Sequence, residues 1–443
     1  MPNDVIPLRE ATRAWFAISL QTFGGPAGQI AVMQHKLVDE KRWIGQQRFL
    51  HALNYCMLLP GPEAQQLAIY TGWLLNGLRG GLIAGVLFVL PGAVSLLALS
   101  ALYVGAGDTT FVEGVFVGLA PAVIAIVVQA VYRVGKRSLH HPLLVALAVT
   151  SFVALTVFAV PFPVVVIGSG LLGWVLSGRF PAMREAHAAA DGPPPLISDD
   201  ALHHDAPSTT RAVKIVLIGL VLWFTPVAVV ALVFSTDSVF VDQGIFFSGA
   251  AVVTFGGAYA VLAYVAQQAV NVFHWLAPGE MVRGLALAET TPGPLIMVVQ
   301  FVAFVGAYRN PGSLDPWVAA GIASLLVTWV TFVPCFVFIF LGAPYVERLR
   351  HNRHLTAALT GITAAVVGVI ANLAFFFALH TLFDETRRVG WDALHLDLPV
   401  LSEWDPVAFA LTGVALVLMF RRGWSPLRTL ALCAPLGLLV TVF

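Results

Sequence analysis

The residues best suited to chemistry in this sequence flank two Pro-Gly-Pro turns set inside strongly apolar segments. The first reads MLLPGPEAQQ at 57 to 66, and the turn recurs 232 positions later in ETTPGPLIMV at 289 to 298. A proline at the start of a helix leaves the amides that follow it without helical partners, and such amides bind negatively charged groups. The two turns therefore predict a binding site for an anion.

A second motif, Phe-Gly-Gly, also occurs twice and offers the same chemistry. FGGPAGQ at 23 to 29 places a proline and small residues after two glycines, and FGG at 255 to 257 repeats the triplet. Four helix starts of this kind, meeting near the middle of a membrane, would form an anion cradle. The predicted substrate-binding residues, which include the polar neighbours of these turns, are Phe23, Gly24, Gly25, Pro26, Gly28, Asn54, Pro60, Gly61, Pro62, Gln65, Gln66, Gly256, Gly257, Thr290, Thr291, Pro292, Gly293 and Pro294.

Side chains distinguish the two copies of the motifs. The first Pro-Gly-Pro is followed by Gln65 and Gln66, whereas the second is followed by apolar residues. We therefore expect the first half of the chain to make more contacts to the substrate. For any single Gln or Asn, a hydrogen bond between helices is an equal alternative.

Two carboxylates, Glu63 and Glu289, adjoin the Pro-Gly-Pro turns. An ionisable group at membrane depth is a functional candidate, and protonation of Glu63 upon anion binding would couple protons to transport. The alternative role of Glu63 is to cap the first turn of a helix, where an acidic residue is favoured. Glu289 precedes its turn and is the weaker of the two proton-coupling candidates.

Composition indicates which kind of fold must position these residues. Hydrophobic residues make up 58% of the 443 positions and charged residues only 11%, with long apolar runs along most of the chain. This composition predicts an all-α, polytopic integral membrane protein in contact with a lipid bilayer. The formal net charge is zero, so no basic surface argues for nucleic acid. The three cysteines lack the spacing of a metal site, and we expect no metal and no cofactor.

The two halves of the chain are similar to each other. Aligning Phe23 with Phe255 and continuing without a gap to Pro62 and Pro294 gives 40 pairs, of which 10 are identical. A second register, offset by 243, pairs Pro91 with Pro334 and extends the similarity through two further helices. We interpret the chain as two copies of a six-segment repeat.

One extra apolar segment lies between the copies. The predicted organisation is a first repeat at 1–178, a polar cytoplasmic linker at 179–212, an odd transmembrane helix at 213–235 and a second repeat at 239–443. Within the linker, His203 and His204 are expected to be solvated. Six segments return the chain to its starting side, so the odd crossing inverts the second copy. The prediction is two inverted-topology repeats, a plan found in many secondary transporters.

Basic loops orient the molecule. The stretches at 132–141, 345–354 and 420–428 are basic, which predicts a cytoplasmic N-terminus and a periplasmic C-terminus. The basic loop at 35–48 violates this rule if the segments at 12–35 and 50–76 each span the membrane. The violation disappears if these segments, and 242–270 and 283–307, are broken into re-entrant half-helices of about ten to fourteen residues. Full spans that Gly and Pro merely kink are the alternative.

The stretches FGGPAGQIAVMQ and LLPGPEAQQLAIYTGW, with the second FGG and TTPGP, resemble the chromate ion transporter family in its long, two-domain form. The resemblance covers nearly the whole chain outside the linker. It implies a bacterial inner-membrane carrier that exports chromate and confers chromate resistance, without a nucleotide-binding domain. Chromate is a tetrahedral dianion, and backbone amides do not distinguish it by shape from its analogue sulfate.

Other function classes stay open as alternatives. An oxyanion channel or a sulfate-type carrier fits the same cradle, and an intramembrane enzyme is disfavoured because HExxH and GxSxG are absent. A monomer and a homodimer are both compatible with the sequence. Saturable flux distinguishes a carrier from a channel.

Overall fold

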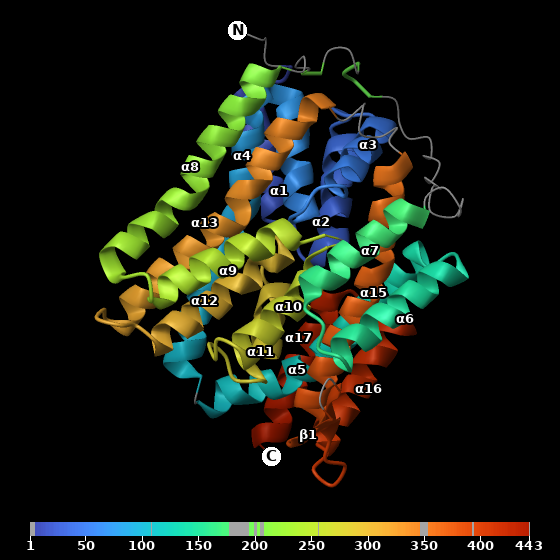
Figure 1. The fold of residues 1–443 in the computed structure, drawn as a ribbon, viewed down its shortest axis with the longest axis vertical. Coiled ribbons are helices and arrows are strands. Elements are labelled where there is room, and N and C mark those ends of the chain that lie inside the picture. The colour runs from blue at the N-terminus through green and yellow to red at the C-terminus, as the bar shows by residue number, and fades with distance from the viewer. Residues whose placement is uncertain are drawn as a thin grey trace. The chain divides into compact units, whose positions relative to one another are not determined.

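The computed structural model is helical, apart from one β-hairpin, over the residues that it describes (Figure 1). The described residues are 5–107, 109–176, 195–198, 202–203, 208–255, 257–345, 353–391 and 394–442. Within these ranges, five helices are long and apolar enough to cross a membrane, and six shorter helices are also apolar. The five long helices are Glu63–Ala106, Thr110–Ser138, Thr209–Phe234, Pro316–Tyr345 and His354–Leu382. The chain is a multi-pass membrane protein.

The four apolar segments with Phe-Gly-Gly or Pro-Gly-Pro are each divided into two helices at the motif. The helix pairs are α1 (Leu8–Ser19) with α2 (Gly25–Gln34), α3 (Gln46–Cys56) with α4 (Glu63–Ala106), α9 (Val239–Val253) with α10 (Ala258–Asn271), and α11 (Glu280–Thr290) with α12 (Val298–Arg309). The 3₁₀ turn η4 (Leu295–Met297) precedes α12. In α4 the backbone leaves the helical conformation at Asn76 and Gly77, so its first thirteen residues form a separate short helix. Positive φ values at the motif glycines explain the breaks, because other residues rarely adopt them.

The helices form two compact units, and each contains parts of both halves of the sequence. Unit 1 comprises Met1–Leu97, Ala186–Ala258 and Thr291–Asn352, and unit 2 comprises Ala98–Glu185, Tyr259–Thr290 and Arg353–Phe443. In unit 1, α13 (Pro316–Gly342) packs against α8 (Thr209–Phe234), α9 and α12. The remaining elements of unit 1 are the π-helical turn η1 (His35–Glu40) and the 3₁₀ turn η5 (Ala343–Tyr345).

Several distant segments meet at one end of unit 1. The amide of Val5 donates to the Leu75 carbonyl at 3.2 Å, and Asn76 Nδ2 donates to the Ile6 carbonyl at 2.5 Å. Lys41, in the loop after α2, lies 3.6 Å from Glu10 of α1. The start of α1, the loop between α2 and α3, and the kink of α4 therefore share one end of this unit.

Two short described pieces of the linker lie at the same end. Leu202 is buried, His203 N donates to the Leu74 carbonyl at 2.8 Å, and the His203 ring contacts the edge of Trp73 at 4.9 Å between centroids. The expectation that His203 is a solvated loop residue is therefore wrong, because the backbone kink at Gly77 leaves space that its ring occupies. His204 and most of the linker lie outside the described residues.

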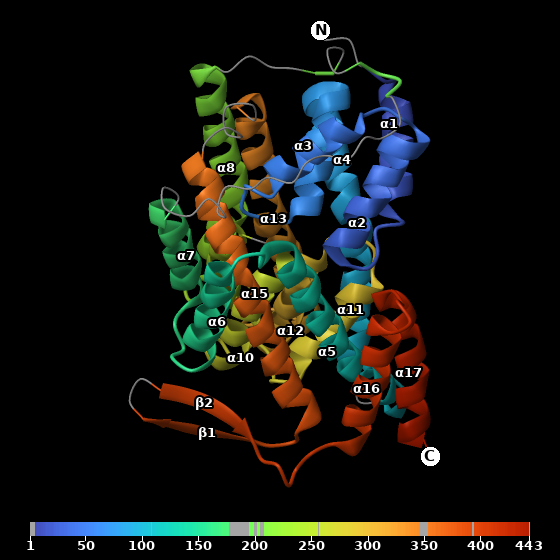
Figure 2. The same ribbon diagram turned by 90° about the vertical axis from the view of Figure 1, so that its right-hand side faces the viewer.

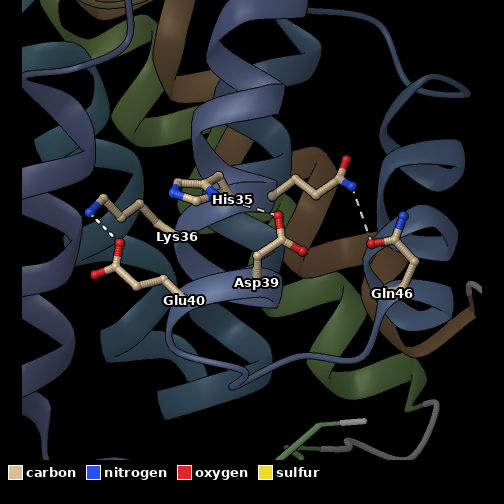
Figure 3. A network of polar contacts seen from close by, with 6 residues as sticks. His35, Lys36, Asp39, Glu40 and Gln46 are labelled. Carbon is tan, nitrogen blue, oxygen red and sulfur yellow. Dashed lines mark hydrogen bonds and ion pairs between the residues drawn. The ribbon is translucent and has the colours of Figure 1, made fainter. Parts of the chain in front are cut away.

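The loop between α2 and α3 carries charges that pair with one another. Figure 3 shows Lys36 turned toward Glu40 and His35 toward Asp39, and Gln34 Nε2 donates to Gln46 Oε1 at 3.2 Å across the loop. The hydrogen bond from Lys36 lowers the pKa of the Glu40 carboxyl. Exposed pairs of this kind contribute little stability.

In unit 2 two helices from different halves of the chain form the centre. The elements are α5 (Thr110–Ser138), α6 (Pro142–Thr156), α7 (Phe162–Leu176), α15 (Arg353–Leu382), α16 (Pro406–Phe420) and α17 (Pro426–Val442), with α10 and α11. Helix α5 packs against α16 and α17, and α15 packs against α6 and α7; α5 and α15 also contact each other (Figure 2). The antiparallel hairpin of β1 (Thr386–Trp391) and β2 (Leu394–Pro399) follows α15.

Candidate functional site

The first Phe-Gly-Gly motif lies against the second Pro-Gly-Pro motif in unit 1. Gly293 N donates to the Thr22 carbonyl at 3.0 Å and to Thr22 Oγ1 at 3.2 Å, and Gln29 Nε2 donates to the Gly293 carbonyl at 2.6 Å. Gly24 and Gly25 both have positive φ, which lets α2 begin directly after the turn. Pro26 occupies the first turn of α2, as the sequence predicts.

The first Pro-Gly-Pro motif lies in turn against the second Phe-Gly-Gly motif, also in unit 1. Gly61 N donates to the Thr254 carbonyl at 2.7 Å. Gly61 and Gly257 have φ values of 117° and 106°, which only glycine adopts readily. Gly256, one of the predicted site residues, lies outside the described residues. The four motifs thus meet as two crossed pairs, each joining the first half of the chain to the second.

A long helix passes close to each Pro-Gly-Pro turn. A Cβ atom added to Gly92 of α4 would lie 2.5 Å from the Pro292 carbonyl oxygen, so the backbones touch there. On the other pair, a Cβ atom added to Gly61 would lie 3.0 Å from Cys335 Sγ of α13. Composition and motif spacing did not identify Gly92 or Cys335 as site residues. The 243-residue register was the available signal, because it aligns these two positions.

Gln65 and Gln66 are both fully buried beside the first Pro-Gly-Pro turn. Gln66 Nε2 donates to the Pro60 carbonyl at 2.6 Å, which closes the turn. Neither amide atom of Gln65 has a hydrogen-bond partner among the described residues. A buried amide without partners costs about 1–3 kcal/mol of stability, which makes Gln65 a candidate to bond a ligand.

The two copies also differ in the number of backbone amides in the first turn of the helix that follows Pro-Gly-Pro. In α4 the first backbone hydrogen bond runs from Gln66 N to the Pro62 carbonyl, so Glu63, Ala64 and Gln65 form a first turn ahead of it. Pro62 therefore precedes the first helical position by one residue. In the second copy, the Met297 amide donates to the Pro294 carbonyl at 2.9 Å within a 3₁₀ turn. The first copy thus presents more amides to a ligand, and helix N-termini favour anions.

The remaining predicted residues differ from one another in exposure and in their contacts. Asn54 is exposed on α3, and the Thr290 hydroxyl donates back into α11 at 2.7 Å from the Leu287 carbonyl oxygen. Thr291 is buried. Gly28 lies against the Phe23 carbonyl, because a Cβ atom added to Gly28 would be 2.5 Å from the Phe23 carbonyl oxygen. Gly28 therefore tightens the start of α2.

The two candidate carboxylates have different surroundings. Glu63 is half-buried as the first residue of α4, which is a capping position. Glu289 is 1% exposed near the end of α11 in unit 2, and Tyr259 of α10 donates to its Oε1 at 2.5 Å. Its Oε2 has no hydrogen-bond partner among the described residues.

The described part of the chain offers few side chains that could bind a metal ion or carry out redox chemistry. No group of three or more His, Cys, Asp or Glu residues is arranged to hold a metal ion there. Cys56, Cys335 and Cys433 are buried free thiols. The site is thus made of backbone amides, glutamines and glycines, which suits recognition of an anion rather than covalent catalysis.

A family model described as Chromate transporter matches residues 9–174 and 241–438. This chain belongs to the chromate transporter family. The chromate transport protein of Pseudomonas aeruginosa is 34% identical over 363 residues, covering 79% of this chain and 76% of that relative. The chromate transport protein of Cupriavidus metallidurans is 28% identical over 423 residues, covering 95% and 90%. A probable chromate transport protein of Synechococcus elongatus is 26% identical, covering 94% and 96%.

Family membership confirms the predicted class: the chain is a chromate-family transporter and not an enzyme. No solved structure matches the chain significantly.

Proposed function

We propose that this protein is a secondary carrier that exports chromate across the bacterial inner membrane through the crossed motif pairs of unit 1. The observation that carries this proposal is the reciprocal hydrogen bond between the motifs, Gly293 N to Thr22 O and Gly61 N to Thr254 O. These bonds hold one Pro-Gly-Pro turn against the segment that follows α1 and the other against the end of α9. The dianion would bind the first-turn amides of α4, with Gln65 as an additional donor.

The membrane potential is sufficient to drive this export. Moving two negative charges out of a cell that is negative inside yields about 4.6 kcal/mol at 100 mV, which sustains a gradient of roughly three decades. Proton coupling is therefore an addition to the driving force and not a requirement. The arrangement does not select by shape between chromate and sulfate, and sulfate transport is the second candidate function.

The inverted repeat is part of this proposal, and reciprocal contacts support it. A two-fold relation between two copies makes every contact between them occur twice with the partners exchanged. Thr22 and Thr254 are 232 positions apart, as are Gly61 and Gly293, and the two hydrogen bonds join them in that exchanged manner. The two parts matched by the family model also begin 232 positions apart, at residues 9 and 241.

Unit 2 contains two similar glycine contacts between the halves of the chain. Gly118 of α5 meets Gly437 of α17, and Gly361 of α15 meets Gly173 of α7. Gly118 and Gly361 are aligned by the 243-residue register. The aligned glycines thus each meet a glycine from the other half of the chain, which supports the repeat.

Re-entry of the first two segments is supported by the shared end of unit 1. If α1 and α2 together spanned the membrane, the loop at 35–48 would lie on the side opposite the N-terminus. Instead, Lys41 reaches Glu10, and the Asn76 side chain reaches Ile6. These contacts support a loop and an α4 kink on the same side as the N-terminus, and the basic residues of the loop favour the cytoplasmic side. By the repeat, the C-terminus is periplasmic.

A cysteine-labelling experiment tests this topology. Gln47, at the start of α3, and Pro278, just before α11, are both exposed and lie at corresponding ends of the two copies' second half-helices. We expect an impermeant thiol reagent added to whole cells to label the Pro278→Cys variant and to leave the Gln47→Cys variant unlabelled until the cells are opened. The native cysteines are buried and give little background. Labelling of Gln47→Cys in intact cells would contradict re-entry.

Gln65 provides a test that separates binding from packing. The Gln65→Leu variant removes a buried amide without partners and keeps the side-chain volume, so we expect unchanged or higher thermal stability in detergent with at least a 10-fold loss of chromate transport. Gln29→Leu is the matched control. Gln29 bonds the Gly293 carbonyl, so this variant should lose stability as well as transport. Full transport by Gln65→Leu would remove Gln65 from the site.

The function itself is tested by uptake of labelled chromate into everted membrane vesicles, with the potential and the pH gradient collapsed separately. Saturable uptake that falls when the potential is collapsed supports a carrier that works in the export direction. Uptake that does not saturate would indicate a channel, and exclusive uptake of sulfate would identify a sulfate carrier.

A further inference from the structure

Helix α11 carries two buried carboxylates, and each accepts a hydrogen bond from a tyrosine. They differ in whether the second carboxylate oxygen also accepts a hydrogen bond. Glu280, at the start of the helix, accepts from Tyr103 at 2.8 Å through Oε1 and from the Ala277 amide at 2.7 Å through Oε2. Glu289, near its end, accepts only from Tyr259, and its Oε2 is buried without a hydrogen-bond partner in the described residues. Glu280 is thus suited to a permanent charge, whereas Glu289 is suited to gaining and losing a proton.

The position of Glu289 in its helix favours the same conclusion. It is the next-to-last residue of α11, where the helix dipole is unfavourable to a negative charge, and it is buried in an apolar setting. The titratable groups that interact with it are Tyr259 of α10 and Arg133 of α5, both in unit 2. Helix α17 also packs against α11 and carries Arg428 and Cys433.

Glu289 also lies where the chain leaves unit 2. The boundary between the two units falls between Thr290 and Thr291, and Gly293, which is bonded to Thr22 and Gln29 in unit 1, follows two residues later. A change of charge at Glu289 therefore acts on the end of a helix that is covalently connected to one of the crossed motif pairs.

We propose that Glu289 is the proton-exchange site of this transporter and that Tyr259 is its positioning residue. This inference rests on the proposed function as a chromate carrier. In each cycle the Glu289 carboxylate takes one proton from water on one side of the membrane and returns it to water on the other side. No covalent bond to chromate forms, and no electrons are transferred. Glu63, which the sequence favoured for this role, acts instead as the cap of α4.

The test uses purified full-length protein in liposomes, with the potential clamped by a potassium ionophore. The measured quantity is the ratio of initial chromate uptake with an imposed pH gradient to uptake without one, at pH values where chromate is the dianion. We expect a ratio different from one for the parent protein and a ratio of one for Glu289→Gln. Potential-driven uptake by Glu289→Gln should persist, which also shows that the variant is folded.

Tyr259→Phe is a second variant with a graded effect. Loss of the hydroxyl removes the donor that stabilises the ionised carboxylate, so the midpoint of the pH dependence of uptake should move to higher pH. A structural role alone would lower the rate at every pH without moving the midpoint.

The chain supplies matched controls on the same helix. Glu280→Gln and Tyr103→Phe make the same chemical changes at the other end of α11, and Glu63→Gln makes one at the first Pro-Gly-Pro; all three should keep the parent ratio. A Glu289→Gln ratio equal to that of the parent overturns the assignment. A parent ratio of one with intact chromate uptake also overturns it and leaves the proposed function standing, whereas absence of chromate uptake by the parent refutes both.

Discussion

The Gly61→Val variant should insert into the membrane and lose about 100-fold in chromate transport, because the substitution costs several kcal/mol of local strain in the first Pro-Gly-Pro turn. Gly61 has a φ of 117°, where a β-branched residue is a genuine outlier. An added Cβ would also lie 2.9 Å from Gln66 Nε2 and 3.0 Å from Cys335 Sγ. The variant therefore disturbs the turn and displaces the Gln66 side chain that closes it.

Gly249→Val is the matched control for this experiment. Gly249 lies on α9 of the same unit, is exposed, and has no atom within 4 Å of an added Cβ. Transport rates are compared at equal amounts of protein in the membrane. A Gly61→Val protein that transports at the parent rate would show that the Pro-Gly-Pro turn is only a packing device and does not position the anion.

The sequence predicted the places where helices break and the residues that line the breaks. The glycines and prolines at 23–26, 60–62 and 292–294 act locally, through backbone conformation and missing amide donors, so their effect is readable from neighbouring residues alone. The predicted half-helix length of about ten to fourteen residues agrees with α1, α2, α3 and α11, which have between 10 and 12 residues.

What the sequence did not predict are contacts between residues far apart in the chain. The hydrogen bond of Gly293 with Thr22 joins positions separated by 271 residues, and nothing in the local pattern of either motif specifies its partner. The same holds for the hydrogen bond from Tyr259 to Glu289, which the sequence around neither residue specifies. This contact distinguishes Glu289 from Glu63 as the proton-exchange candidate. Pairing of this kind depends on the packing of whole helices.

The β-hairpin after α15 was missed for a different reason. No strand was predicted from the sequence in the region at 383–404. Leu394, Leu396 and Leu398 alternate with other residues, which is the period of a strand and was the available signal. The linker contact of His203 had no such signal, since it depends on the kink of α4 at Gly77.

The Gly118→Ala variant is expected to lose about 3 kcal/mol or more of stability, because it adds a methyl group where two helices are already in backbone contact. A Cβ on Gly118 of α5 would lie 1.9 Å from the Cys433 carbonyl oxygen of α17, and one on Gly437 would lie 2.1 Å from Gly118 N. Neither backbone can move aside without separating α5 from α17. Thermal unfolding of the detergent-solubilised protein measures the loss.

The repeat supplies a second variant and the fold supplies a control. Gly361→Ala, at the aligned position of α15, would place its Cβ 2.5 Å from the Ser169 carbonyl oxygen of α7 and should destabilise the protein similarly. Gly413→Ala, at an exposed position of α16, meets no atom within 4 Å and should be neutral or slightly stabilising, since alanine favours helix by about 1 kcal/mol over glycine. Destabilisation by Gly118→Ala without destabilisation by Gly361→Ala would break the equivalence of the two crossings. In that outcome the inverted repeat would hold for the motif pairs of unit 1 but not for the helix packing of unit 2.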